Sequence, residues 1–364
     1  MLFLLSPQVI QTSIDDLKNI TRTELVVVDE KGALIARNSE EIEIDKERVI
    51  EFVMSPAASQ AIAGLLYLKI CDETEVMYVL ICRDNSEDYT IAKIAVAQLQ
   101  NLNIAYKERL DKNNFFQNLI LDNLLLVDIY NKARKMRINV EVPRVVYLIE
   151  AKTEGDNEIQ EILKSLFTTQ AGDFVTSVDE KNIILIKQLE NKENSEEVEN
   201  IARMIGDMIN TEAMIQVKVS YGTVVGELKE VSKSYKEAKM ALDVGKIFYA
   251  DKSVVSYSSL GIGRLIYQLP VNLCQMFMDE IFGDSRDELL DEETLATVNM
   301  FLDNNLNVSE TARKLFVHRN TLLYRLEKLE KSTGLDIRVF EDALTLKIAF
   351  MVVSYLKYLE NTQY

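Results

Sequence analysis

Short apolar runs separated by turn residues dominate the first hundred positions of the chain. The segment ELVVVDEKGALIAR places two such runs around a Glu-Lys-Gly turn, where Gly32 supplies the backbone freedom that a tight hairpin needs. The later runs LLYLKIC and VMYVLICR are typical of a second hairpin in the same sheet. With a helical stretch ahead of them, these patterns predict a small antiparallel sheet flanked by helices over residues 1–100.

The second hairpin carries two of the three cysteines, Cys71 and Cys82. Pairing its strands around Asp72–Glu75 puts the two sulfurs at opposite ends, roughly 20 Å apart at about 3.3 Å per residue. A disulfide needs a far shorter separation, so we expect unpaired, buried thiols. The sheet with its flanking helices resembles a PAS-like sensory module, a shape that many α+β domains share. We therefore expect residues 1–100 to form a small-molecule sensory domain.

The apolar spacing changes to a helical period from about Tyr89 to Leu126. Two interpretations fit this long pattern: a signal helix that forms a dimer, or a helix packed on its own domain. Residues 101–140 are expected to form a helical linker. The apolar positions that define the period are Ile91, Ile94, Ala95, Leu99, Leu102 and Ala105.

Strands and helices alternate in a regular order over residues 141–257. The apolar run PRVVYLIEA is followed by an amphipathic helix, a hairpin about Asp179–Asn182, a second helix and the alternating strand IQVKVSYG. This order, β-α-β-β-α-β, is the split arrangement of ferredoxin-like domains. A further helix, SYKEAKMALDVG, is predicted to stop at Gly245, and residues 258–290 are predicted to form a helical connector.

Two short helices joined by a tight turn are predicted in NVSETARKLFVHRNTLLYRLEKLEKSTG, which starts at Asn307. Asn307 can cap the first helix while Glu310 reaches back to it, as in a capping box. Ala312 is small enough to lie where two helices cross closely. This layout, within an all-helical segment 291–364, is typical of a helix-turn-helix DNA-binding domain. The buried stripe of the second helix is predicted to be Leu322, Leu326 and Leu329.

Polar side chains on the recognition helix, residues 319–331, and at its start suit DNA contacts. Arg and Asn side chains can make paired hydrogen bonds to base edges, and Thr, Tyr and Lys suit phosphates. Two members have another interpretation, since Arg325 could pair with a carboxylate and His318 could simply cap the helix. The candidate DNA-binding residues are His318, Arg319, Asn320, Thr321, Tyr324, Arg325 and Lys328.

The chain as a whole is acidic, but the predicted helix-turn-helix is not. Lys and Arg number 41 against 58 Asp and Glu, a net charge of −17 that argues against indiscriminate binding to nucleic acid. Between Val308 and Phe340 the balance reverses, with seven Lys and Arg against four Asp and Glu. An acidic body with one basic module suits a protein that touches DNA in one place. No run of about twenty apolar residues occurs, so we expect no membrane span and a cytoplasmic location.

The segment VSETARKLFVHRNTLLYRLEKLEKSTGLDI, with EDALTLKIAF behind it, resembles the C-terminal module of the CdaR/PucR-type regulators of sugar-diacid utilisation and purine catabolism. The core HRNT-x-x-YRL carries most of the likeness, and Phe316 stands where many other helix-turn-helix proteins have glycine. Upstream, SYKEAKMAL is similar to the degenerate GGDEF-like domain of the same family. The resemblance implies a transcription regulator of a carbohydrate, organic-acid or other catabolic operon. We expect it to bind a double-stranded DNA operator as a homodimer or higher homo-oligomer, and to respond to a small-molecule effector.

The middle domain leaves an enzymatic alternative open, in which the chain is a nucleotide-binding or cyclase-type signalling protein. Phosphoryl chemistry would need metal-binding carboxylates and a glycine turn at the central hairpin. The hairpin TSVDEKNI has Asp179 and Glu180 but no glycine pair, and Glu150 is a lone acid. We therefore expect no catalytic residues, no metal and no cofactor.

An organic-acid effector would call for arginines in a pocket of the first domain. Arg37 and Arg83, each at the end of a predicted strand, are the candidates. Surface salt bridges would explain both residues equally well.

Overall fold

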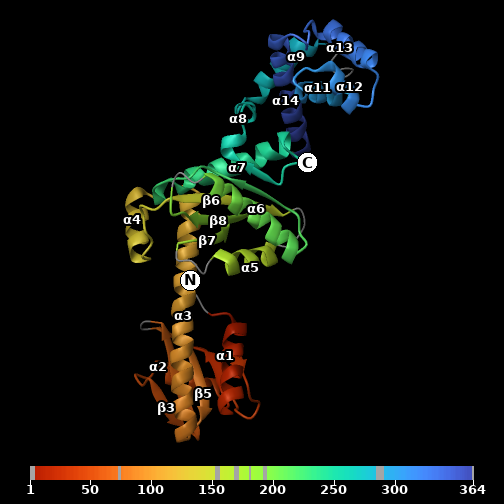
Figure 1. Ribbon diagram of the computed structural model, residues 1–364. Coiled ribbons are helices and arrows are strands. Elements are labelled where there is room, and N and C mark those ends of the chain that lie inside the picture. The colour runs from red at the N-terminus through yellow and green to blue at the C-terminus, as the bar shows by residue number, and fades with distance from the viewer. Residues whose placement is uncertain are drawn as a thin grey trace. The chain divides into compact units, whose positions relative to one another are not determined.

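The computed structural model describes residues 5–72, 75–151, 156–167, 172–179, 182–191, 195–283 and 291–362. The chain divides into two compact units, Met1–Phe115 (unit 1) and Phe116–Tyr364 (unit 2). Both combine helices and strands, as Figure 1 shows, so the predicted mixed α+β class is confirmed. In the described ranges, no helix combines the length and the apolar character that crossing a membrane requires. The finer division of the chain into five segments stays a prediction.

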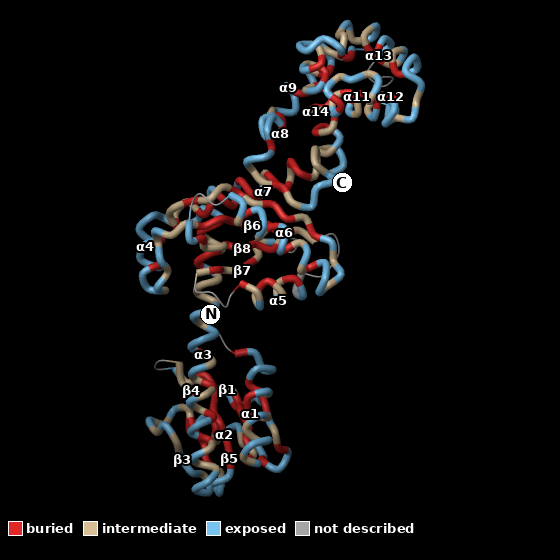
Figure 2. Tube along the Cα trace, viewed as in Figure 1, coloured by how far each residue is buried: buried red, intermediate tan, exposed pale blue. Residues whose placement is uncertain are grey.

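Unit 1 is an antiparallel sheet with helices on both faces. Its elements are α1 (Pro7–Thr21), β1 (Val26–Asp29), β2 (Leu34–Arg37), α2 (Lys46–Met54), β3 (Ser59–Ile62), β4 (Leu65–Asp72), β5 (Glu75–Arg83) and α3 (Ser86–Ile120). The strand order is β2-β1-β5-β4-β3. On one face Ile14 of α1 and Ala95 of α3 pack with Leu80 of β5, and on the other Val49 and Phe52 of α2 cover the sheet. Figure 2 shows the buried residues gathered along the strands between these helices.

The first hairpin forms as predicted, with β1 and β2 antiparallel around Gly32 at φ +76°. The Asp29 carboxylate accepts hydrogen bonds from the N–H groups of Lys31 and Ala33, at 2.9 and 2.7 Å. The turn is therefore closed by its own aspartate as well as by the glycine. The PAS-like character of unit 1 stays a prediction.

The second hairpin separates its two cysteines as predicted. Cys71 lies opposite Val76 at one end, and Cys82 lies opposite Leu66 at the other. All three cysteines are unpaired thiols, and Cys82 and Cys274 are buried. Cys71 is only half-buried, so the prediction of buried thiols was wrong for this residue, which stands near the end of β4.

The first part of α3 packs on the sheet of unit 1. Ala92, Ala95 and Leu99 are buried in the core that α1 also lines, as expected for a helix packed on its own domain. On other sides of the helix, Ile94 and Ile104 are 54% and 52% exposed. The alternative of a dimer-forming helix therefore stays a prediction.

The helix ends at Ile120, earlier than predicted. Asp122 adopts φ +64°, in the left-handed region, and the N–H of Asn123 donates to the Asn118 carbonyl at 2.9 Å. These contacts cap the C-terminus of α3, because they satisfy carbonyls that have no partner within the helix. A separate helix, α4 (Leu126–Lys135), follows.

The middle of the chain follows the predicted β-α-β-β-α-β order, which is confirmed. It comprises β6 (Arg144–Ala151), α5 (Asp156–Phe167), β7 (Phe174–Ser177), β8 (Asn182–Gln188), α6 (Ser195–Glu212) and β9 (Val217–Tyr221). These strands are antiparallel in the order β9-β6-β8-β7, as in a ferredoxin-like domain. After them come η1 (Leu228–Glu230), α7 (Val231–Phe248), β10 (Val254–Ser256), η2 (Tyr257–Ser259), α8 (Gly263–Tyr267) and α9 (Val271–Phe282). β10 adds to the sheet in parallel with β9.

Gly245 does not stop its helix as predicted, since α7 continues to Phe248. A Cβ atom on Gly245 would lie 3.0 Å from a methyl carbon of Val255 on β10. The glycine therefore allows close approach of helix and strand, and its role is packing rather than termination.

The C-terminal part of unit 2 is all helical, as predicted. It comprises α11 (Glu292–Asp303), α12 (Val308–Lys314), α13 (Arg319–Thr333) and α14 (Phe340–Thr362). These helices share one core with α9, in which Phe282 and Phe350 meet edge to face at 5.6 Å between ring centres.

Candidate DNA-binding site

The helix-turn-helix is held by a buried seam between α12, α13 and their neighbours. Leu322, Leu326 and Leu329 of α13 are at most 2% exposed, which confirms the predicted stripe. Ala312 of α12 is buried at the crossing, also as predicted. Phe301 of α11 and Leu346 of α14 belong to the same core. With its inner face fixed in this way, α13 presents its other face to solvent.

The N-terminus of α12 is capped by Asn307, whose side-chain oxygen accepts from the N–H groups of Ser309 and Glu310, both at 3.1 Å. The predicted return contact from Glu310 was wrong. The Asn307 N–H already donates to the Asn304 carbonyl at 3.1 Å, so it needs no further acceptor. Glu310 instead pairs with Arg313, one turn along, at 2.7 Å, which lowers the pKa of its carboxyl group.

The turn between the helices contains an unusual residue, Phe316. Its φ of +55° lies in the left-handed region, and its side chain is 95% exposed. The Val317 N–H donates to the Ala312 carbonyl at 3.0 Å, which closes the turn. A bulky residue in this conformation is strained, and the chain tolerates it without any burial of the ring.

His318 is the N-cap of the recognition helix. Its Nδ1 accepts from the Asn320 N–H at 3.2 Å, which is the capping alternative left open by the sequence. Because the ring is exposed, capping does not prevent His318 from also facing a ligand. The cap fixes the direction of the first turn of α13.

The outer face of α13 is exposed and chemically available. We use the name outer face for five residues: Arg319, Asn320, Thr321, Tyr324 and Lys328. Within the described part of the chain, no hydrogen bond or ion pair involves their side chains. Tyr324 is 68% exposed. A ligand can therefore bind these donors and acceptors without breaking a hydrogen bond or ion pair within the described chain.

Arg325 points to the opposite side, toward α11. Its guanidinium donates to the Thr297 hydroxyl at 3.2 Å and pairs with the Glu293 carboxylate. This is the carboxylate alternative that the sequence left open. No local pattern could have predicted these partners, because they lie 28 and 32 residues away. Contact of Arg325 with DNA stays a prediction.

The electrostatics near Arg325 include the N-cap of α11. The Asp291 carboxylate accepts from the Thr294 N–H at 2.6 Å. That backbone hydrogen bond lowers the pKa of Asp291, helped by the Thr294 hydroxyl and by the charges of Lys328 and Arg325. Charge interactions therefore link α11 and α13, in addition to the apolar core that they share.

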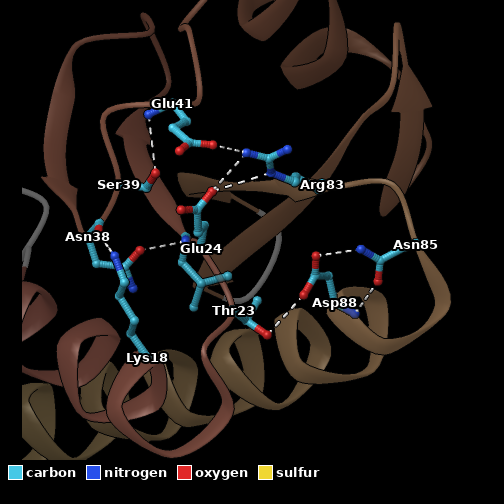
Figure 3. A network of polar contacts seen from close by, with 10 residues as sticks. Lys18, Thr23, Glu24, Asn38, Ser39, Glu41, Arg83, Asn85 and Asp88 are labelled. Atoms are coloured by element: carbon cyan, nitrogen blue, oxygen red, sulfur yellow. Dashed lines mark hydrogen bonds and ion pairs between the residues drawn. The ribbon is translucent and has the colours of Figure 1, made fainter.

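The two arginines predicted for an effector in unit 1 are held in ion pairs. Figure 3 shows Arg83 between two carboxylates: Glu24, at 3.2 Å, and Glu41. Hydrogen bonding to Glu24 is the main cause that raises the pKa of Arg83. Arg37 lies 3.5 Å from Glu40, on a strand separated from β5 by β1. The two arginines therefore belong to separate ion pairs, and ligand binding by either stays a prediction.

The carboxylates considered for phosphoryl chemistry are engaged in the fold. The Lys246 Nζ lies 2.6 Å from the Glu150 Oε1. The Asp179 carboxylate accepts hydrogen bonds from the Asn182 backbone N–H at 2.7 Å and from the Asn182 side-chain amide at 2.9 Å. Glu180 lies outside the described residues. Among the residues that the structure describes, no group of three or more His, Cys, Asp or Glu side chains could hold a metal ion.

Comparison with known protein families agrees with this geometry. A family model described as the PucR C-terminal helix-turn-helix domain matches residues 294–352, which include α12, α13 and most of α11. The chain contains a PucR C-terminal helix-turn-helix domain. A second model, described as a GGDEF-like domain, matches residues 123–244. The predicted resemblance to the CdaR/PucR-type regulators is confirmed in both domains.

Named relatives of this chain include three bacterial regulators. It is 25% identical over 241 residues to the carbohydrate diacid regulator of Escherichia coli (strain K12), which covers 60% of each chain. It is 28% identical over 148 residues to the purine catabolism regulatory protein of Bacillus subtilis (strain 168), which covers 39% of this chain and 28% of that protein. The proline-responsive transcriptional activator PutR of the same Bacillus strain is 24% identical over 232 residues, with 60% and 56% covered. The chain thus spans less than two thirds of the length of each of these relatives.

Proposed function

We propose that this protein is a ligand-responsive, DNA-binding regulator of transcription, acting on a carbohydrate, organic-acid or other catabolic operon. The observation that carries the proposal is the outer face of α13. Its first turn presents an arginine and an asparagine, and the same face also presents hydroxyl groups and a lysine. The PucR-type domain and the names of the relatives support the same function. The outer face suits the major groove of DNA, because that groove admits an α-helix and exposes base edges to its polar side chains.

In the proposed complex the first turns of α13 enter the major groove. Arg319 and Asn320 read base edges, because a guanidinium fits guanine and a carboxamide fits adenine through paired hydrogen bonds. Thr321, Tyr324 and Lys328 contact phosphates and fix the register of the helix. Glu327 is exposed on the same helix and would repel phosphate, so we place only the N-terminal turns in the groove.

The regulator acts as a homodimer in this proposal, with unit 1 as a PAS-like sensory domain. A two-fold symmetric dimer would recognise two half-sites separated by about one turn of the DNA helix. The acidity of the chain supports local contact with DNA, because a net charge of −17 over all 364 residues disfavours other modes of approach.

The middle domain takes no part in catalysis in this proposal. Pairing of Glu150 with Lys246 supports this, since a carboxylate neutralised at 2.6 Å is a poor ligand for a catalytic metal. Incubation of the protein with Mg²⁺ and GTP or ATP tests the point. Nucleotide turnover without DNA selectivity would favour the signalling alternative over the regulator.

The direct test is selection of genomic DNA fragments on the purified full-length protein. A regulator should enrich a small set of sites, and the genes beside them should encode catabolic enzymes or transporters. The double variant Arg319→Ala, Asn320→Ala should lose the enrichment. The control Arg338→Ala removes a positive charge from the same module that is already paired with Asp336 and Glu330, and it should keep the enrichment. Equal enrichment by the double variant would refute the proposed reading face.

A further inference from the structure

A hollow of about 440 Å³ lies in unit 1, beside the edge of β4. β3 pairs with β4 only as far as Leu68. Beyond that point the Lys69 N–H donates to the Ala58 carbonyl at 3.0 Å, and the segment 56–59 forms one wall of the hollow. Its volume falls within the range of about 300–1,000 Å³ that small-molecule sites occupy.

The opposite wall belongs to α3. Lys93, Val96 and Gln100 line it, at a spacing of three and four residues that places them on one face of the helix. Leu68 and Val76 add apolar surface from the sheet. The hollow therefore combines an apolar lining with a few polar groups, which is the usual make-up of a site for a small organic molecule.

The charge of the lining is unlike that of the rest of the chain. It includes two lysines, Lys69 and Lys93, and no Asp or Glu, although acidic residues outnumber basic residues 58 to 41 overall. Lys69 is committed to the fold: its Nζ donates to the carbonyls of Val53, at 3.0 Å, and Ser55. A positive charge without a paired carboxylate on an acidic protein favours an anionic ligand.

Lys93 is the lysine that can meet such a ligand. Its Nζ lies 4.5 Å from the centre of the Tyr89 ring, and a side-chain hydrogen bond from Lys93 is the main cause that lowers the pKa of the Tyr89 phenol. No carboxylate in the described part of the chain pairs with Lys93. Gln100 lies nearby, and its side-chain amide donates to the Cys71 carbonyl at 3.5 Å. That distance is at the long limit of a hydrogen bond, so the amide can exchange this partner at little cost.

We propose that this hollow binds a small organic acid with a short apolar chain. The Lys93 ammonium and the Gln100 amide receive the carboxylate, and Leu68, Val76 and Val96 contact the chain. The inference rests on the proposed function in one respect, because it names the chemical class and the site of the effector. It moves the effector site away from Arg37 and Arg83, which do not line the hollow.

The position of the site suggests how binding is reported. A ligand at Lys93 and Gln100 contacts α3 directly, and α3 continues to Ile120, within unit 2. Occupation of the hollow therefore changes the contacts of a helix that both units share.

Cys71 offers a reporter, because it lines the hollow and is half-buried. The other two thiols are buried, at 0% and 1% exposure, and burial raises the pKa of Cys82 to about 12. An uncharged thiol reagent such as iodoacetamide should therefore label Cys71 selectively in the native protein. The probe is a series of straight-chain carboxylates from acetate to hexanoate, compared with the matching neutral amides at equal ionic strength.

The expected result is a several-fold slowing of Cys71 labelling by the carboxylates, which increases with chain length until the hollow is filled, and little slowing by the amides. Lys93→Met should abolish this protection, measured within the variant as the ratio of the labelling rates with and without acid. The control Lys31→Met removes an exposed lysine outside the hollow, paired with Glu30, and should keep the protection.

Three results would overturn the proposal: no protection by any carboxylate, equal protection by acids and amides, or full protection in Lys93→Met. The labelling experiment uses no DNA, so its failure leaves the proposed reading of DNA intact. Conversely, failure of the genomic selection leaves a carboxylate site in unit 1 untouched, but removes its role as an effector site.

Discussion

Two exposed arginines of this protein have opposite surroundings. Arg83, at the end of β5 in unit 1, is paired with Glu24 and Glu41. Arg319, at the start of α13 in unit 2, has no ion-pair partner in the described chain. Both residues are exposed and both were candidates for binding from the sequence. The difference shows that exposure alone does not make a charged group available, because a local carboxylate can already satisfy it.

The same contrast separates neighbours on α13. Arg325 is six residues from Arg319 on the same helix, yet it faces α11 and pairs with Glu293. The buried stripe of α13 sets this division between an inner and an outer face. If availability, as opposed to charge, governs binding, substitutions at paired and at unpaired positions should differ in their effects.

The largest expected effect comes from the inner face. Leu326→Ala should destabilise the C-terminal module, α11 to α14, by about 2–5 kcal/mol. The substitution opens a cavity at a side chain that is 2% exposed. Hydrogen exchange of the α13 amides in the full-length protein measures this free energy. Leu344→Ala, at a position that is 42% exposed, is the control and should cost less than about 0.5 kcal/mol. Equal effects of the two changes would mean that the seam does not hold α13.

The comparison of Arg319 with Arg83 predicts the next largest effect, a loss of operator affinity. Arg319→Ala should weaken specific operator binding by roughly 1–3 kcal/mol, because a base contact is lost. Arg83→Ala removes the same charge from a paired site in unit 1 and should leave operator affinity unchanged. Fluorescence anisotropy with a selected operator measures both variants at one salt concentration. A similar loss for both would show that overall charge, and not the outer face, determines binding.

Phe316 provides a test of the turn that directs the outer face. Phe316→Gly should stabilise the module by about 1 kcal/mol, since glycine accepts φ +55° and the exposed ring contributes no burial. Phe316→Ala keeps the backbone strain and should bring no such gain. Thermal unfolding of the full-length variants distinguishes them. Destabilisation by glycine would reveal a contact of the ring that outweighs the strain.

Variants of Arg325 and Glu293 can show whether Arg325 positions α13 or contacts DNA. A double-mutant cycle with Arg325→Ala and Glu293→Gln should give a coupling of about 0.2–1 kcal/mol, because the pair is partly exposed to solvent. If Arg325 only positions α13, the two single variants should weaken operator binding alike. If Arg325 touches DNA, its loss alone should weaken binding, and this result would return it to the outer face.

The smallest expected effect is that of Lys328. Lys328→Ala should weaken binding equally across DNA sequences and lower the slope of log affinity against log salt by about one unit, because one phosphate contact is lost. Titrations at several salt concentrations, with specific and random DNA, measure the slope. A change in sequence preference would instead place Lys328 at a base edge.

The order of elements was predictable because it rests on short-range signals. The period of the apolar residues fixed the two hairpins, the β-α-β-β-α-β series and the buried stripe of α13, and Asn307 marked the start of α12. The exceptions are instructive. Gly245 carries a stop signal that tertiary packing overrides, because α7 needs a residue without a side chain where it meets Val255. Glu310 turns to Arg313, because the backbone donor it was predicted to reach is already satisfied.

By itself, the sequence determined most of the helices and strands, and which helix carries DNA-binding chemistry, but it missed α2 and β3 and misplaced the ends of α3 and α7. Only the tertiary structure decided which charged groups are available. Arg83 meets carboxylates 59 and 42 residues away, and Arg325 meets one 32 residues away, while Lys93 meets none in the described chain. The physical reason is that apolar periodicity acts over a few residues, whereas the choice of a charge partner depends on distances that only the folded chain defines.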